Sequence, residues 1–418
     1  MDLDAYVTRL GEQARRAARQ LVSMSTAKKD AALGRLAQAI INQSEFLAGE
    51  NSKDLERTAG EGASAAFLDR LKLTPARIEA MADGVRQVAA LPDPIGEVIS
   101  GCTRPNGLRI LQVRVPIGVV GFIYESRPNV TVDAAALCLK SGNAVILRGG
   151  KEAMNSNLAL VKLIGESLTA EGIDPLAIQM VDRPEHEVVS LMARADKYID
   201  VIIPRGGEAL IRAIVERATV PVIKHYKGVC HVYVDEDADL EMARAICYNA
   251  KVQRPSVCNA METLLVHEAV ARKFLPNMMA DFRRKNVEIR GCERTREIVP
   301  DAKAATEEDW GREYLDLILA VRVVGSLEEA IDHIERYSSR HSDGIVTRNV
   351  MHAEEFVKRV DSAAVFVNTS TRFSDGYQFG MGAEIGISTD KLHARGPMGL
   401  RELTSYKWVV YGEGQLRE

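Results

Sequence analysis

The chain has 418 residues, 46% hydrophobic and 27% charged, and its formal net charge is −4. This length predicts two domains or more, and the slightly acidic balance without a basic block argues against a nucleic-acid-binding protein. Six scattered cysteines without C-x-x-C spacing, an N-terminus unlike a signal peptide and the lack of a membrane-length apolar run predict a cytoplasmic protein without disulfides or a zinc ribbon.

Residues 3–91 are predicted to be helical. Leu3, Tyr6 and Leu10 recur at a spacing near 3.6 residues, which is typical of an amphipathic helix. A later helix is expected to begin at Thr74, with Pro75 in its first position, and to run to about residue 91. This segment holds little chemistry of its own and is expected to pack over a sheet.

Residues 98–115 change to a strand-like pattern. Two apolar runs, 98–100 and 108–115, flank Pro105-Asn106-Gly107, and Asn-Gly between such runs predicts a β-hairpin. The hairpin is either the edge of a sheet or an arm that pairs with another subunit.

Strands and helices alternate from residue 118 to residue 224. Strands are expected at 119–124, 144–147, 178–181, 200–203 and 220–223, and helices at 130–141, 155–170, 185–195 and 207–217. This alternation predicts a parallel sheet covered on both faces, in which ligands bind beyond the carboxyl ends of the strands.

Two turns of this region combine glycines with cations. Arg148-Gly149-Gly150-Lys151 and Pro204-Arg205-Gly206-Gly207 each follow a strand and precede a helix. Backbone N–H groups at a helix start, together with Arg or Lys, suit a phosphate group. Neither turn has G-x-G-x-x-G or Walker spacing, so an ordinary turn is the alternative to a nucleotide site.

A second α/β region follows. Strands are expected at 232–234, 263–266, 287–289, 317–324, 344–347 and 363–367, and helices at 239–249, 268–284, 326–337 and 352–359. The loop 253–260 carries Cys258 just before a buried strand, where a nucleophile would be held rigidly. The alternative is a buried structural thiol. Residues 380–399 are expected to form a long ordered loop, and 404–411 a last strand.

Four blocks of sequence carry a resemblance to a known family. They are Tyr124-Glu125-Ser126-Arg127-Pro128-Asn129-Val130-Thr131, Lys140-Ser141-Gly142-Asn143-Ala144-Val145-Ile146-Leu147-Arg148-Gly149-Gly150-Lys151, Gln253-Arg254-Pro255-Ser256-Val257-Cys258-Asn259-Ala260, and Gly382-Ala383-Glu384-Ile385-Gly386-Ile387-Ser388-Thr389 with the segment 391–400. The chain resembles the γ-glutamyl phosphate reductases of the aldehyde dehydrogenase superfamily nearly from end to end.

The resemblance implies a fold and a reaction. The fold class is α/β, with two Rossmann-like domains and a small oligomerisation hairpin. The dinucleotide-binding domain would comprise residues 1–97 and 116–229, the catalytic domain 230–385, and the oligomerisation elements 98–115 and 400–415. The expected activity is reduction of L-glutamate 5-phosphate by NADPH to glutamate 5-semialdehyde and phosphate, the second step of proline biosynthesis.

The resemblance also implies catalytic residues. Cys258 would be the nucleophile, whose thiolate expels phosphate and forms a thioester that accepts hydride. Asn129 would stabilise the oxyanion together with the amide of the nucleophile. The alternative role for Asn129 is to cap the helix expected at residue 130.

The cofactor residues follow from the same comparison. Arg148 and Lys151, with Gly149 and Gly150, would bind the adenosine side of the cofactor, and their two positive charges favour the 2′-phosphate of NADP(H). The turn Pro204-Arg205-Gly206-Gly207 would complete the cofactor site. Glu313 would hold the nicotinamide ribose.

His225 marks a departure from the broader superfamily. It stands where hydrolytic members carry the glutamate that activates water, so its presence disfavours thioester hydrolysis. His225 is either a base or a structural histidine. Together with Arg127, Lys224 and Arg254 it is a candidate substrate-binding residue, and no metal site is expected because the histidines and cysteines show no ligand spacing.

The resemblance also implies an assembly state and partners, and other functions of the same fold are the alternatives. We expect a homodimer or homotetramer without nucleic acid or membrane partners, and possible coupling to the upstream glutamate kinase. A hydrolytic or CoA-dependent aldehyde dehydrogenase, or a non-catalytic scaffold of the same fold, are the alternatives.

Overall fold

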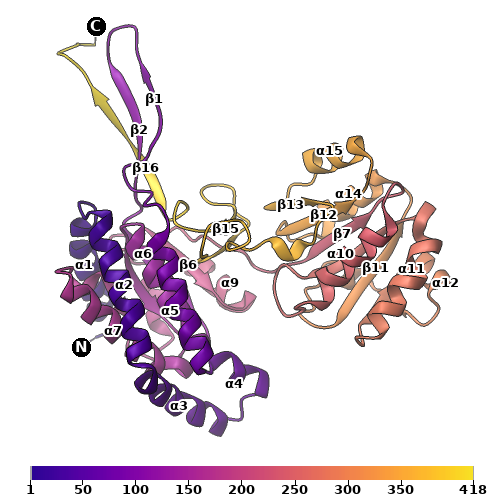
Figure 1. Cartoon of the computed structure of the whole chain (residues 1–418), viewed down its shortest axis with the longest axis horizontal. Coiled ribbons are helices and arrows are strands. Elements are labelled where there is room, and N and C mark those ends of the chain that lie inside the picture. The colour runs from indigo at the N-terminus through magenta and orange to yellow at the C-terminus, as the bar shows by residue number, and fades with distance from the viewer. Residues whose placement is uncertain (1, 418) are drawn as a thin grey trace. The chain divides into compact units, whose positions relative to one another are not determined.

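The computed structural model describes residues 2–417, which form two compact units (Figure 1). Unit 1 contains residues 2–224, 380–386 and 398–417, and unit 2 contains 225–379 and 387–397. The units therefore divide at residues 224 and 225, whereas the sequence placed the division at 229 and 230, and the hairpin belongs to unit 1. The functional role of each unit stays a prediction.

Unit 1 is built on a parallel four-stranded sheet with the order β5-β4-β3-β6. Its strands are β3 (Val119–Tyr124), β4 (Ala144–Arg148), β5 (Ile178–Met180) and β6 (Val201–Arg205). Its helices are α1 (Leu3–Leu21), α2 (Thr26–Asn42), α3 (Ser44–Gly60), α4 (Ala65–Leu71), α5 (Pro75–Ala90), α6 (Asn129–Lys140), α7 (Met154–Ala170), α8 (Glu187–Ala193) and α9 (Glu208–Arg217). Helices α6 and α7 pack on one face of the sheet, and α1 packs on the other face. The predicted parallel sheet with helices on both faces is confirmed.

The N-terminal helices follow the predicted pattern. Helix α5 begins at Pro75, and the Thr74 hydroxyl accepts a hydrogen bond from the Arg77 amide, which satisfies a backbone donor at the helix start. The apolar positions of α1, among them Tyr6 and Leu10, are buried. Burial of each large apolar side chain stabilises the fold by about 1.5–3 kcal/mol, and this term holds the helical layer on the sheet.

The predicted hairpin is also confirmed. Strands β1 (Val98–Thr103) and β2 (Arg109–Pro116) pair antiparallel, and β16 (Thr404–Tyr411) pairs with β2 to make a three-stranded sheet. Gly107 has a φ of 88°, a conformation that glycine adopts without the steric cost of a side chain.

Unit 2 contains a parallel seven-stranded sheet with the order β10-β9-β11-β8-β7-β12-β13. Its strands are β7 (Cys230–Val234), β8 (Met261–His267), β9 (Glu288–Gly291), β10 (Lys303–Ala304), β11 (Ile318–Val324), β12 (Ser342–Val346) and β13 (Ala364–Val367). Its helices are α10 (Leu240–Val252), α11 (Glu268–Arg283), α12 (Glu293–Ile298), α13 (Glu307–Trp310), α14 (Leu327–Tyr337) and α15 (Val350–Arg359).

Strand β8 shows how this sheet holds two cores. Leu264 and Val266 pack into the core formed with α10 and α11, whereas Leu265 between them packs into the core formed with α14 and α15. Successive side chains of a strand point to opposite faces, so an uninterrupted apolar run is what a doubly covered strand requires.

Two expectations about elements were wrong. Residues 220–223 form no strand: Val222 makes one isolated bridge with Ile202, and Pro221 lacks the N–H that a ladder would use. The segment 380–399 is not purely a loop, because β14 (Gly386–Ser388) and β15 (Gly396–Met398) pair within it.

Candidate functional site

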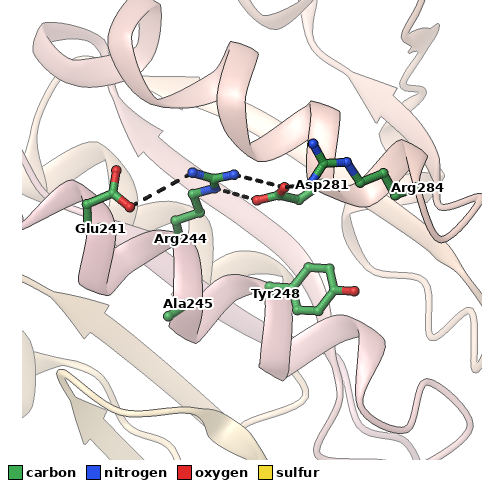
Figure 2. Close-up of a pocket in the computed structure, with 6 residues that line it drawn as sticks. All are labelled: Glu241, Arg244, Ala245, Tyr248, Asp281 and Arg284. Atoms are coloured by element: carbon green, nitrogen blue, oxygen red, sulfur yellow. Dashed lines mark hydrogen bonds and ion pairs between the residues drawn. The ribbon is translucent and has the colours of Figure 1, made fainter.

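A surface pocket lies between α10 and α11 and is lined mainly by charged side chains (Figure 2). Arg244 forms an ion pair with Asp281, and Arg284 also contacts Asp281, while the Tyr248 ring stacks on Phe282. These groups satisfy one another and bring no nucleophile or acid–base pair together. We therefore assign no chemistry to this pocket.

The loop that carries Cys258 is held by hydrogen bonds to a later segment of the chain. It follows α10 and precedes β8, and Asn259 in it is buried. The side-chain amide of Asn259 donates to the Ser374 backbone carbonyl at 2.9 Å, and the Asn259 backbone carbonyl accepts from the Thr371 hydroxyl at 2.8 Å. These two hydrogen bonds hold the Cys258 loop against the segment that follows β13.

The six cysteines differ in their fitness as nucleophiles, and all are free. Cys138, Cys230 and Cys247 are buried, and burial raises the pKa of each thiol above its ordinary value, so these thiols stay protonated. Cys102 is exposed on β1. Cys258 is only half-buried, so the alternative of a buried structural thiol does not describe it.

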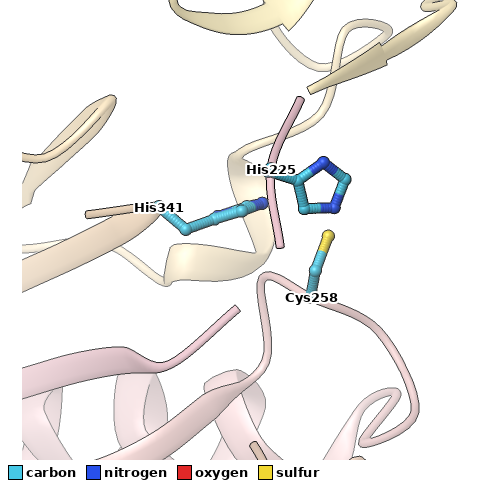
Figure 3. Close-up of side chains that lie close together, drawn as sticks. All are labelled: His225, Cys258 and His341. Carbon is cyan, nitrogen blue, oxygen red and sulfur yellow. The ribbon is translucent and has the colours of Figure 1, made fainter. Parts of the chain in front are cut away.

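Two histidines lie beside Cys258. One nitrogen of His225, one nitrogen of His341 and the Cys258 sulfur all lie within 4.8 Å of one another, and Figure 3 shows a ring nitrogen of His225 directed at the sulfur. His225 Nδ1 lies 2.9 Å from the Ile387 carbonyl oxygen. A carbonyl only accepts, so Nδ1 carries the hydrogen, and Nε2 of the neutral ring presents its lone pair.

His341 was missed by the sequence analysis. It is buried at the start of β12, and its Nδ1 lies 2.8 Å from the Ser342 hydroxyl oxygen. His341 is distant from Cys258 in the chain, and only the parallel pairing of β12 with β7 and of β7 with β8 brings their ends together. No short spacing in the sequence signals this neighbour.

The backbone of Gly228 packs directly against the Cys258 loop. A Cβ at this position would lie 1.8 Å from the Cys258 carbonyl oxygen, so only glycine fits. The same oxygen accepts a hydrogen bond from the Cys230 thiol at 3.1 Å. The Gly228 amide donates to Glu313 Oε1 at 2.8 Å, so Glu313, the predicted nicotinamide-ribose residue, here supports the backbone beside Cys258.

Cations also lie near the loop. Arg254 is exposed, and Arg372 Nε donates to Gln253 Oε1 at 2.9 Å. Burial lowers the pKa of Arg372, and the charge of Arg254 adds to this effect. Arg372 was missed by the sequence analysis. The other two substrate candidates, exposed Arg127 and half-buried Lys224, belong to unit 1.

The candidate cofactor residues other than Glu313 lie at the carboxyl ends of the strands of the unit 1 sheet, whereas Glu313 belongs to unit 2. Strands β3, β4 and β6 are parallel, so the turns that follow them lie at the same edge. These turns are Glu125–Asn129, Gly149–Lys151 and Gly206–Gly207. The first and the third of these turns are joined, because Glu125 accepts a hydrogen bond from the Gly207 amide at 3.0 Å.

Gly149 and Gly206 of these turns stand where a side chain would not fit. A Cβ on Gly149 would lie 2.3 Å from the Asn157 amide nitrogen, and one on Gly206 would lie 2.6 Å from a Glu125 oxygen. Arg148 is buried and donates to the Gly149 and Pro184 carbonyls, so its guanidinium shapes the turn. The Lys151 side chain is 63% exposed, and its Nζ lies 3.8 Å from a carboxylate oxygen of Glu61.

Asn129 does not cap a helix. It is the first residue of α6, and its side-chain nitrogen donates to Asp133 Oδ2 at 3.1 Å. The alternative capping role is therefore wrong, because the helix begins one residue earlier than the sequence suggested. Burial raises the pKa of Asp133 to about 6, although the hydrogen bond from Asn129 and the charge of Arg205 oppose the rise.

No helix among residues 2–417 is long and apolar enough to cross a membrane. The model of the aldehyde dehydrogenase family matches residues 4–308. The chain is 58% identical to the γ-glutamyl phosphate reductase of Moorella thermoacetica over the full length of both. It is 59% identical to that of Carboxydothermus hydrogenoformans, over 98% of this chain and 99% of the relative. The crystal structure of γ-glutamyl phosphate reductase from Thermotoga maritima is similar with a TM-score of 0.97 and 48% identity, over 99% of this chain and all of the other.

Proposed function

Because this chain belongs to the γ-glutamyl phosphate reductases, within the aldehyde dehydrogenase family, we propose that it reduces L-glutamate 5-phosphate to L-glutamate 5-semialdehyde and phosphate with NADPH. This reaction is the second step of proline biosynthesis. The observation that carries the proposal is the placement of Cys258, a half-buried thiol within 4.8 Å of nitrogens of His225 and His341.

The first chemical step uses this thiol. His225 Nε2 takes the proton of Cys258, and the sulfur attacks the carbonyl carbon of the acyl phosphate. A carbon–sulfur bond forms, the carbon–oxygen bond to phosphate breaks, and phosphate leaves with the bonding electron pair. The product is a γ-glutamyl thioester on Cys258. The hydrogen bond from His225 Nδ1 to Ile387 fixes the ring in the tautomer that this step needs.

The developing oxyanion requires donors. Asn129 and the backbone amide of Cys258 are the proposed pair, each such donor being worth about 10²–10³ in rate. Asp133 accepts a hydrogen bond from the Asn129 amide group, and this contact restricts the rotation of the side chain. Asp133 would thus act as a positioning residue for Asn129.

The second step is reduction of the thioester. When bound, the nicotinamide would supply a hydride to the thioester carbon, the carbon–sulfur bond would break to release the semialdehyde, and His225 would return its proton to the Cys258 thiolate. The chain's part is to bind and orient the cofactor through Arg148, Gly149, Gly150 and Lys151, the turn Pro204-Arg205-Gly206-Gly207, and Glu313. Exposed Lys151 supports NADPH over NADH, because its charge attracts the 2′-phosphate.

The substrate carries a phosphate and an α-carboxylate, so cations beside the thiol suit it. We propose that Arg254 and Arg372 bind these anions, since both are near the Cys258 loop and Arg372 is held by Gln253. Arg127 and Lys224 remain further candidates.

The proposal also includes a homo-oligomeric assembly and a cytoplasmic location. Tyr406, Trp408 and Val410 on β16 are exposed at alternate positions, so one face of this strand is apolar, which supports a homodimer or homotetramer. All six cysteines are free, which suits a reducing cytoplasm. Functional coupling to the upstream glutamate kinase is part of the same proposal.

The test follows NADP⁺ reduction with glutamate 5-semialdehyde, with phosphate, with coenzyme A, and with neither. We expect turnover only with phosphate, and none from Cys258→Ser. Turnover in water alone would indicate a hydrolytic dehydrogenase, and turnover with coenzyme A would indicate an acylating one. Lack of turnover under every condition would indicate a non-catalytic scaffold.

A further inference from the structure

The cluster of His225, His341 and Cys258 also has the composition of a metal site. Two imidazoles and one thiolate are the ligands that zinc and similar soft or borderline divalent cations prefer. Their candidate ligand atoms lie within 4.8 Å of one another (Figure 3). Zn–N bonds of about 2.0–2.1 Å and Zn–S bonds of about 2.3 Å at tetrahedral angles separate ligand atoms by about 3.3–3.8 Å. Side-chain movements of about 1 Å would therefore close the site.

The groups behind the two imidazoles support this assignment. His225 Nδ1 is held by the Ile387 carbonyl at 2.9 Å, and His341 Nδ1 lies 2.8 Å from the Ser342 hydroxyl. Metal-binding histidines characteristically have their second nitrogen bonded to an oxygen in this way, which fixes the ring and its tautomer. In both rings Nε2 is the nitrogen that a cation would engage.

Access to the cluster is open enough for an ion. His225 and Cys258 are half-buried, whereas His341 is fully buried and forms the floor of the cluster. A tetrahedral ion with these three ligands keeps one position for water, as in open zinc sites. Binding converts the thiol to a thiolate ligand and releases one proton.

We propose that His225, His341 and Cys258 form a reversible inhibitory site for Zn²⁺ and chemically similar divalent cations. Occupancy would withdraw the nucleophilic sulfur and the His225 lone pair from the reaction at the same time. The inhibitory effect rests on the proposed function, because it requires Cys258 to be the nucleophile. The binding itself does not depend on that function.

The test is a titration of the purified full chain with Co²⁺, a spectroscopic substitute for Zn²⁺. We expect a sulfur-to-cobalt charge-transfer band in the near ultraviolet, together with the intense visible bands of a tetrahedral site. Added Zn²⁺ should remove both. Cys258→Ser should abolish the charge-transfer band, and His225→Asn and His341→Asn should each weaken binding by about tenfold or more.

A matched control comes from the second ligand cluster in residues 2–417, formed by Asp235, Asp237 and His352. His352→Asn alters that cluster and should leave the charge-transfer band and the activity unchanged. His341 is buried, so the thermal melting of each variant is compared with the unsubstituted protein, and half-buried His225 carries the test if His341→Asn does not fold. A charge-transfer band that survives Cys258→Ser, or cobalt affinity unchanged in a folded His225→Asn protein, would overturn the proposal.

Discussion

Gly228→Ala is the substitution for which the structure gives the sharpest expectation. The new Cβ would lie 1.8 Å from the Cys258 carbonyl oxygen and 2.5 Å from its Cα, and both neighbours are backbone. Such contacts do not occur below 3.0 Å, so the Cys258 backbone must move by about 1 Å or more. A misplacement of about 1 Å at a reacting group costs on the order of 10²-fold in rate.

The shift would also disturb what surrounds the loop. The Cys230 thiol would lose its 3.1 Å hydrogen bond to the Cys258 carbonyl, and overpacking in a tight site costs about 1–3 kcal/mol in the free energy of unfolding. We therefore expect the kcat/KM for semialdehyde oxidation to fall about 100-fold, with a lower melting temperature.

The assay is phosphate-dependent NADP⁺ reduction, with Gly311→Ala as the matched control. Gly311 lies in the same unit, and a Cβ there meets no atom within 4 Å. The control should keep kcat/KM within about twofold of the unsubstituted protein. A folded Gly228→Ala protein with undiminished kcat/KM would refute the argument that Gly228 positions the nucleophile.

Three further substitutions test separate parts of the account. Lys151→Glu should raise the Kd of NADPH about tenfold or more and that of NADH far less, with exposed Lys197→Glu as a control; equal changes would remove the 2′-phosphate role. The pKa of Asp133 is about 6 in the folded state, against an ordinary value of 3.8, so the folded state binds this proton more tightly than the unfolded state does. The stability that this provides is complete below about pH 4 and is lost as the pH rises to about 6. As the pH is raised from about 4 to about 6, the unfolding free energy of Asp133→Asn should therefore rise by on the order of 2 kcal/mol relative to that of the unsubstituted protein. A difference between the two proteins that does not depend on pH would contradict the pKa shift. Arg372→Gln should raise the KM for phosphate about tenfold in semialdehyde oxidation without raising that for NADP⁺; an unchanged phosphate KM would exclude Arg372 from anion binding.

The elements were largely predictable because local rules determine them. Thr74 and Pro75 mark a helix start that depends on their own chemistry, and the apolar alternation of 404–411 defines β16 to the residue. The strand expected around Val222 failed because local apolar character does not reveal whether a partner strand is in reach, and Pro221 removes a donor.

The site was predictable only in part, because tertiary pairing assembles it. Cys258 stands out by its loop and by the family blocks, but His341 reaches it only through the order of β12, β7 and β8 in the sheet. Arg372 likewise comes from a distant segment. The contact between Asn129 and Asp133 could have been predicted from their spacing, because residues four apart lie side by side on a helix. That prediction would have needed a helix that begins at Asn129, whereas the sequence suggested a start at residue 130.

In the proposed mechanism, Cys258 forms a thioester that phosphate releases. Mass spectrometry of the protein tests this step directly, after reaction with glutamate 5-semialdehyde and NADP⁺ in the absence of phosphate and again after addition of phosphate. We predict an acyl adduct on the peptide that contains Cys258, accompanied by NADPH equivalent to the active sites, and loss of the adduct when phosphate is added. An adduct on another cysteine, or steady NADPH formation without phosphate and without an adduct, would contradict it.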